Sequence, residues 1–169
     1  MRYEKRILAF IDILGFSEEI KNSVDKNTGK EIEPKTEKID KLFEKVLAID
    51  KKEYKFIEDN VKSKKVSHFS DSVTISYLLE EEAGIFHILS DILYFCISIF
   101  HDGYLIRGAI TYGDLHHSES KLYGPAMLAA YDMEKKLAFY PRVVFENKIM
   151  DIAKEYPAKW PSKLKQSIA

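Results

Sequence analysis

The sequence has few features that would mark a secreted, membrane-bound or polyanion-coating protein. A single cysteine, Cys96, leaves no partner for an internal disulfide or a thiolate zinc site, which indicates a reducing, cytoplasmic environment. Basic residues are not in excess, because 26 Lys and Arg face 27 Asp and Glu and leave a formal charge of −1. This balance argues against binding to nucleic acid or to an anionic membrane, so any bound polyanion is expected to be small.

Long apolar runs and targeting segments are also missing. The N-terminal run is interrupted by Asp12, and no small-residue cleavage pattern follows it. The most apolar stretch, Ile85 to Phe100, contains His87, Ser90 and Asp91 and falls short of the roughly 20 residues that span a bilayer. We therefore predict a core helix there and no membrane association.

Apolar residues are nevertheless abundant enough for a sizeable core. Of 169 residues, 46% are hydrophobic and 12% aromatic, which excludes wholesale disorder and suits one domain. We predict a single domain over residues 1–155, with a surface loop at 24–35 after a short helix at 17–21. Residues 156–169 contain two prolines and little periodicity, and we expect them to form an irregular tail.

The spacing of apolar residues predicts an α+β fold. A continuous apolar and β-branched run is typical of a strand buried on both faces, and recurrence every three or four residues is typical of a helix. The expected elements are a strand at 6–14, a helix at 36–60, a hairpin at 65–70 and 73–78, a helix at 80–101, a strand at 104–112, a helix at 124–136, a strand at 141–145 and a helix at 146–155. This order is a ferredoxin-like βαββαβ core with a C-terminal helix–strand–helix extension.

Two aspartates stand out as candidate metal ligands. Asp12 interrupts the strand at a place where burial of an isolated charge is costly, so it must be neutral, paired or bound to a cation. Asp71 lies at the turn between two strands that flank or neighbour the first, so both carboxylates can reach one edge of the sheet. Paired carboxylates suit Mg²⁺ or Mn²⁺. Caps of a helix and of a turn, respectively, are the alternative interpretations of the two residues.

Candidate phosphate contacts follow from nearby residues. Gly15, Phe16 and Ser17 lead into a short helix, whose backbone N–H groups can bind an anion. Arg107 and Arg142, inside one strand and at the start of another, can donate a bidentate fork to phosphate. Structural or surface roles for both arginines are equally compatible with the sequence. His116 and His117 are expected in an exposed loop.

Four segments together resemble the catalytic domain of class III nucleotidyl cyclases, most closely the bacterial anti-phage pyrimidine cyclases known as Pycsar cyclases. They appear in the family's order between residues 6 and 145, and they are 10–17 (FIDILGFS), 69–73 (FSDSV), 105–113 (LIRGAITYG) and 123–134 (YGPAMLAAYDME).

The resemblance implies specific roles for these residues. Asp12 and Asp71 would bind two Mg²⁺ or Mn²⁺ ions, with the backbone carbonyl of Ile13 as a further ligand. Gly15, Phe16 and Ser17 would hold the triphosphate of a nucleoside triphosphate. The site would form in a head-to-tail homodimer, and the product, a cyclic nucleotide, would act as a second messenger in anti-phage defence.

Departures from the family pattern bear on the substrate. Leu128 and Asp132 occupy the places where purine-specific enzymes carry an Asn and an Arg. Ser67 and His68 stand near the place of a purine-reading Lys, so a pyrimidine fits better, while CTP or UTP stays open and no base-binding residue is assigned.

Two other classes of protein compete with this interpretation. A cyclase-like module without turnover, which senses nucleotides or binds a partner, is the main alternative. A palm-type polymerase or a diguanylate cyclase is disfavoured, because the signature hairpin of the diguanylate cyclases is replaced here by Ser70-Asp71-Ser72.

Overall fold

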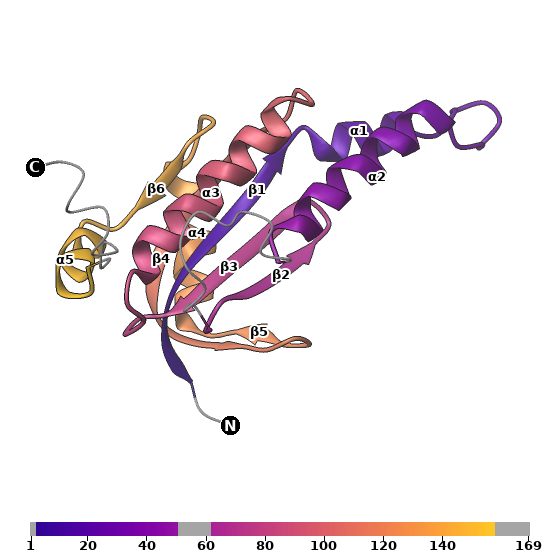
Figure 1. The fold of residues 1–169 in the computed structure, drawn as a ribbon. Coiled ribbons are helices and arrows are strands. Elements are labelled where there is room, and N and C mark those ends of the chain that lie inside the picture. Colours follow the sequence, from indigo (N-terminus) through magenta and orange to yellow (C-terminus); the bar gives the residue numbers. More distant parts are fainter. Residues whose placement is uncertain (1–2, 51–61, 158–169) are drawn as a thin grey trace, which may run out of the picture.

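The computed structural model describes residues 3–50 and 62–157, and every structural statement below refers to those residues. Their elements follow the predicted order, except that β5, a two-residue strand between β4 and α4, was not predicted (Figure 1). They are β1 (Glu4–Leu14), α1 (Phe16–Asn22), α2 (Glu33–Ala48), β2 (Lys65–Phe69), β3 (Ser72–Leu78), α3 (Gly84–Phe100), β4 (Leu105–His117), β5 (Leu122–Tyr123), α4 (Pro125–Leu137), β6 (Val143–Phe145) and α5 (Lys148–Glu155).

The strands form one six-stranded sheet in the order β2-β3-β1-β4-β5, with β6 parallel to β4. The other neighbours are antiparallel. The order β2-β3-β1-β4 is that of the ferredoxin-like plan, which confirms the predicted fold class. β1 lies between β3 and β4 because its apolar side chains need cover on both faces of the sheet.

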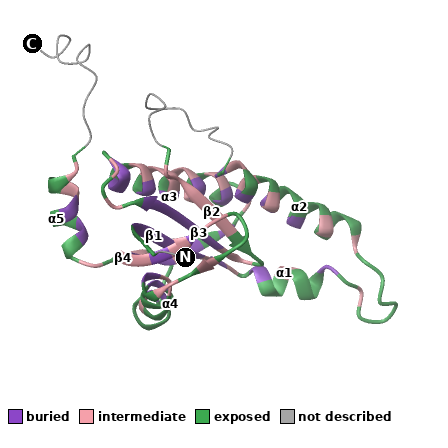
Figure 2. Ribbon diagram, turned by 90° about the horizontal axis from the view of Figure 1, so that it is seen from below, coloured by how far each residue is buried: buried purple, intermediate pink, exposed green. Residues whose placement is uncertain are grey.

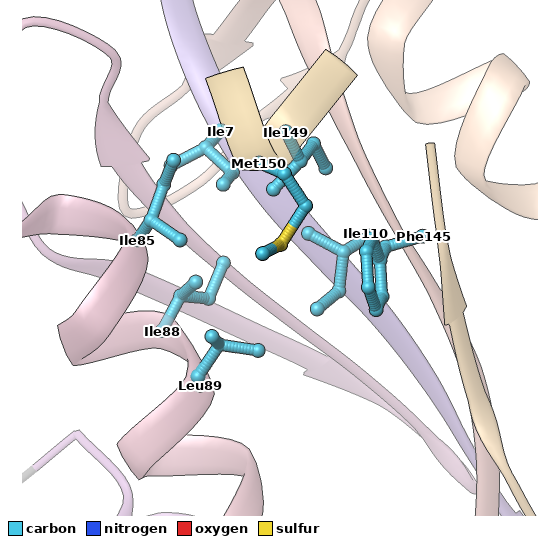
Figure 3. A pocket seen from close by; sticks show the side chains of 8 residues that line it. All are labelled: Ile7, Ile85, Ile88, Leu89, Ile110, Phe145, Ile149 and Met150. Atoms are coloured by element: carbon cyan, nitrogen blue, oxygen red, sulfur yellow. The ribbon is translucent and has the colours of Figure 1, made fainter. Parts of the chain in front are cut away.

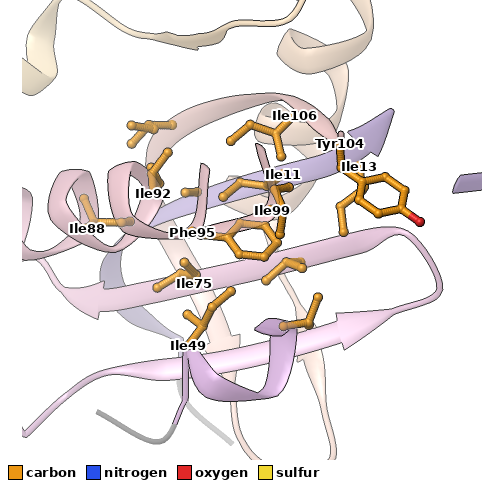
Figure 4. Packing of buried hydrophobic residues seen from close by; sticks show 14 of the residues in the cluster. Ile11, Ile13, Ile49, Ile75, Ile88, Ile92, Phe95, Ile99, Tyr104 and Ile106 are labelled. Atoms are coloured by element: carbon orange, nitrogen blue, oxygen red, sulfur yellow. The ribbon is translucent and has the colours of Figure 1, made fainter. Parts of the chain in front are cut away.

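Successive side chains of β1 point to opposite faces of the sheet, and each face is covered by different helices (Figure 2). Ile7, Ala9, Ile11 and Ile13 face α2, α3 and α5 in the main core, part of which is drawn in Figure 4. Leu8 and Phe10 face α4, where they pack with apolar side chains of α4, including Ala126 and Ala130, and of β4. Each fully buried isoleucine contributes roughly 1.5–3 kcal/mol of burial free energy.

The long helix α3 is covered by the sheet on one side. Asp91, the charge within its apolar run, is nearly buried and pairs with Lys64 at 2.9 Å. The other side of α3 carries apolar side chains that are about half exposed, namely Phe86, Leu89, Leu93, Ile97 and Phe100. No helix in the described ranges is long and apolar enough to cross a membrane.

Two helix starts differ from the sequence-based prediction. α2 begins at Glu33 rather than residue 36, because Pro34 occupies the first helical turn, where its missing N–H costs nothing. The loop predicted at 24–35 is correspondingly shorter. α3 begins at Gly84 rather than residue 80, after Ala83 in a left-handed conformation. The part of the predicted 36–60 helix at 51–60 lies outside the described residues.

The prediction that a strand ends at Tyr112 and that His116 and His117 lie in an exposed loop is wrong. β4 continues to His117, because Asp114 and Leu115 pair with the start of β1 and Leu115 is fully buried. Lys5 and Asp114 form an ion pair at 3.0 Å across this ladder. The polar pair Gly113-Asp114 suggested a turn, but pairing with a strand far away in sequence keeps the chain extended.

Candidate active site

Asp12 and Asp71 meet at one end of the central strands. Asp12 lies near the end of β1, opposite Ser72 of β3, and Asp71 occupies the turn that joins β2 to β3. The backbone N–H of Ile13 donates to the carbonyl of Asp71 at 2.9 Å, which fixes the turn beside β1. Burial is the main cause of the raised pKa of Asp12, and the negative charge of Asp71 adds a smaller contribution in the same direction.

Arg107 lies directly opposite Asp12 on β4. Its Nε donates a hydrogen bond to Oδ2 of Asp12 at 2.9 Å, and the Asp12 side chain is only 19% exposed. The residue predicted to contact phosphate is therefore paired with a predicted metal ligand. This pairing gives Asp12 the cationic partner that a half-buried carboxylate requires.

Glu134 of α4 completes this cluster and was not predicted as a site residue. Its Oε1 lies 2.7 Å from the same Nε of Arg107, and its side chain is only 4% exposed. The spacing of Ala126, Ala130 and Glu134 by four residues places all three on the buried side of α4. That spacing is the signal in the sequence that could have identified Glu134.

Burial dominates the electrostatics of these acids. It raises the pKa of Asp12, an effect that Arg107 partly opposes. Burial likewise raises the pKa of Glu134, again opposed by Arg107. Both carboxylates are thus stabilised as anions mainly by one guanidinium, and loss of that partner would favour their protonated forms.

The residues present fit a divalent cation that retains exchangeable ligands. The described part of the chain contains no group of three or more His, Cys, Asp or Glu side chains arranged to hold a metal. Two carboxylates with a backbone carbonyl, the remainder coming from water and substrate, form the oxygen donor set that Mg²⁺ takes at phosphate sites. Asp12, Asp71 and Ile13 are the residues that would supply it.

Gly15 turns the chain from β1 into α1 in a left-handed conformation, with φ 84°. Phe16 is buried and packs edge-on against Phe43, so only its backbone is available to an anion. Ser17 is exposed. The predicted triphosphate contacts of these residues therefore rest on backbone N–H groups of the first helical turn.

Arg142, the second arginine predicted to contact phosphate, does not pair with the acids of this cluster. Its backbone carbonyl accepts a hydrogen bond from Gly108 N–H at 3.0 Å, next to Arg107. Its side chain is exposed and donates to the carbonyl of Leu137 at the end of α4. The structure thus brings together Asp12, Asp71 and Arg107 but directs the guanidinium of Arg142 to a helix terminus.

His117 belongs to a separate buried polar network on the same face of the sheet. Its Nδ1 lies 2.7 Å from Oγ of Ser76, and its Nε2 lies 2.9 Å from Oγ of Ser67. Arg6, also buried, donates to Ser76 at 2.9 Å. Burial, together with the charges of Arg6 and Lys65, lowers the pKa of His117 to about 4, so the ring is neutral at pH 7.

A small hollow on the opposite face of the sheet is unsuited to a nucleotide. Apolar side chains of β1, α3, β4, β6 and α5 line it, including Ile7, Ile88 and Met150 (Figure 3). It offers no polar partner for phosphate or sugar. The candidate site is consequently the cluster of Asp12, Asp71 and Arg107 on the face of the sheet that α4 covers.

Comparison with solved structures identifies the fold. The chain is similar to the adenylyl cyclase CyaB from P. aeruginosa, with a TM-score of 0.63 and 13% identity over 92% of this chain and 82% of that one. It is similar to a bacterial light-regulated adenylyl cyclase, with a TM-score of 0.58 and 17% identity over 95% and 83% of the two chains.

A third similar structure is the catalytic core of a rhodopsin-guanylyl cyclase with converted specificity in complex with ATPαS. Its TM-score is 0.61, at 16% identity over 91% of this chain and 83% of that one. No protein-family model and no curated protein sequence matches the chain. The protein therefore has the fold of class III nucleotidyl cyclase catalytic domains, and at these identities the likeness establishes the fold alone.

Proposed function

We propose that this protein is a metal-dependent nucleotidyl cyclase that converts CTP or UTP to its 3′,5′-cyclic monophosphate and pyrophosphate. One observation carries the proposal. In a chain with a nucleotidyl cyclase fold, Asp12 and Asp71 lie together at one end of the central strands, and the Arg107 guanidinium pairs with Asp12 there. A module that binds no metal has no evident need of two partly buried carboxylates at this place.

The reaction needs no protein nucleophile. The ribose 3′-oxygen attacks the α-phosphorus, its proton is lost to solvent, and the bond to the pyrophosphate oxygen breaks. Divalent cations held by Asp12, Asp71 and the Ile13 carbonyl would lower the pKa of the 3′-hydroxyl and neutralise the leaving pyrophosphate.

The chain's own groups orient the triphosphate. Arg107 is 37% exposed, so its guanidinium can contact phosphate oxygens while it stays beside Asp12. Backbone N–H groups of residues 15–17 bind the outer phosphates at the start of α1. Arg142 joins them only by releasing the Leu137 carbonyl.

The proposed pyrimidine specificity rests on Ser67 and His68, which stand near the place of a purine-reading Lys in the family. The hydroxyl of Ser67 lies 2.9 Å from Nε2 of His117. On α4, Leu128 and Asp132 replace the Asn and the Arg of the purine-specific enzymes, and Asp132 pairs with Lys136 at 3.0 Å. By the same resemblance to Pycsar cyclases, the cyclic product would act as a second messenger in anti-phage defence.

A head-to-tail homodimer would complete the site. Phe69 lies in the same cross-strand row as Ser72 and Asp12 and is 84% exposed. Leu128 adds a second exposed apolar side chain on the same side of the sheet. Large exposed apolar groups beside a polar site are typical of a surface that a partner covers.

The main alternative is a cyclase-like module without turnover. Its support is the replacement of the usual Asn and Arg by Leu128 and Asp132, together with the pairing of Asp12 with Arg107. This alternative predicts nucleotide or partner binding without a cyclic product.

The decisive experiment incubates the purified protein with each of the four NTPs and Mn²⁺ and identifies the products by mass. We expect cyclic CMP or cyclic UMP, lost in Asp12→Asn and in Asp71→Asn but retained in Asp151→Asn, which changes an exposed acid of α5. Cyclic purines alone would refute the pyrimidine specificity. No product from folded, dimeric protein would favour the inactive module.

A further inference from the structure

The Arg107 guanidinium has two carboxylate acceptors for one hydrogen. Its Nε carries a single N–H, and this N–H points to Asp12 Oδ2 at 2.9 Å. Oε1 of Glu134 lies 2.7 Å from the same nitrogen, yet among residues 3–50 and 62–157 it accepts no hydrogen bond. A buried carboxylate oxygen beside a donor that is already engaged has a high cost, so it calls for a second state in which the donor serves it.

The two carboxylates that compete for the Arg107 Nε–H differ in how deeply they are buried. Glu134 is 4% exposed and lies on α4, whereas Asp12 is 19% exposed and lies near the end of β1. A divalent cation can therefore reach Asp12 but not Glu134. When Asp12 is engaged, release of Arg107 into solvent would leave Glu134 as an unpaired buried charge, which is strongly unfavourable.

We propose that Glu134 is a positioning residue that takes over the Nε–H of Arg107 when a divalent cation occupies Asp12. This inference rests on the proposed function, since it assumes that the cluster of Asp12, Asp71 and Arg107 binds a cation and a triphosphate. Without a cation, Arg107 neutralises Asp12. With a cation, Glu134 keeps Arg107 beside the site and leaves its two outer nitrogens for the phosphates.

A double-mutant cycle on Mn²⁺ affinity tests this exchange without any nucleotide. Free Mn²⁺ is measured by electron paramagnetic resonance for the full chain and for Glu134→Gln, Arg107→Met and the double variant. With Arg107 present, we expect Glu134→Gln to weaken Mn²⁺ binding about 10-fold, because the charged acceptor that draws Arg107 from Asp12 is lost. With Arg107→Met, the same substitution should change the affinity less than about 2-fold.

The outcomes separate this role from simple alternatives. An equal loss in both backgrounds would mean that Glu134 acts through its own charge and would overturn the proposal. No effect in either background would overturn it as well, as would a wild-type protein that binds no Mn²⁺. Asp151→Asn, which removes a remote exposed acid, is the control for net charge and should leave the affinity unchanged.

Nuclear magnetic resonance of the wild type provides a test that does not depend on the folding of any variant. The chain has only four arginines, so the arginine Nε–H signals can be assigned. We expect the Arg107 signal to shift on addition of Mg²⁺ and to stay protected from exchange with water. An unchanged signal at saturating Mg²⁺, or one lost to exchange, would overturn the proposal.

The two proposals can fail separately. Coupling between Glu134 and Arg107 in a protein that turns over no NTP would retain the exchange and refute the cyclase. Turnover without coupling would retain the cyclase and refute the exchange. In an active enzyme, Glu134→Gln should also raise KM for the NTP more than it lowers kcat, because the positioning of Arg107 mainly serves triphosphate binding.

Discussion

Asp12 and Arg107 are 95 residues apart in sequence and face each other in register across β1 and β4, joined by a 2.9 Å hydrogen bond. This cross-strand pair explains how an acid is tolerated in the central strand, since an unpaired carboxylate there would be costly. It also means that a cation entering the site must compete with a guanidinium. The pair therefore compensates the charge of Asp12 and also sets how readily a divalent cation binds there in the proposed reaction.

Arg107→Lys is expected to reduce kcat/KM by about 100-fold, because an ammonium cannot reproduce the fork of a guanidinium on phosphate. Thermal stability should change little, since lysine keeps a positive charge near Asp12. Steady-state kinetics with the preferred NTP, together with thermal unfolding, check both parts. Turnover near the wild-type rate would remove Arg107 from the triphosphate site.

His117 makes stability depend on pH in a predictable direction. Its folded-state pKa of about 4 lies below the ordinary value of 6.5, so between these values the unfolded chain binds more protons than the folded one. The stabilising contribution of neutral His117 is thus fully present above pH 6.5 and is lost as the pH falls toward 4. We expect urea unfolding to show a loss of about 2 kcal/mol from His117 between pH 7.5 and 5.

The control for this pH effect is His117→Gln, which keeps polar atoms but does not titrate. Burial also lowers the pKa of His87, so only the difference between wild type and variant isolates His117. Equal pH dependence of the two proteins would contradict a neutral, buried His117.

Gly124→Ala is predicted to destabilise the protein by about 3 kcal/mol. Its φ is 150°, and a Cβ would lie 2.6 Å from the carbonyl oxygen of Asp114. Gly15→Ala is the matched comparison, because Gly15 has φ 84° but no atom within 4 Å of a Cβ. Only the left-handed conformation then costs energy, about 1 kcal/mol. Chemical denaturation measures both, and equal losses would contradict the steric argument.

Phe69→Asp is expected to convert the proposed homodimer to a monomer without unfolding it, because the side chain is 84% exposed. Sedimentation velocity measures the change, and loss of NTP turnover should accompany it. Phe86→Asp, on the opposite side of the sheet on α3, is the control and should leave the dimer intact. Dissociation by Phe86→Asp alone would place the interface on α3.

Local patterns in the sequence were sufficient for the elements and their order, with the exception of the short strand β5. The apolar run around Asp12, the spacing of apolar residues in α3 and the Gly124-Pro125 start of α4 act over a few residues, so they can be recognised without the tertiary structure. Errors occurred at ends of elements, as at Pro34 and at Gly113-Asp114, where residues common in turns lie inside regular structure.

The sequence by itself determined the βαββαβ plan and marked Asp12 and Asp71 as unusual, since a carboxylate inside an apolar strand stands out locally. Only the tertiary structure decided that Arg107 binds Asp12, that Glu134 lies beside both, and that His117 is buried between Ser67 and Ser76. These contacts depend on the register of strands and on the placement of α4 against the sheet. That register is set by packing of the whole core, which no short segment encodes.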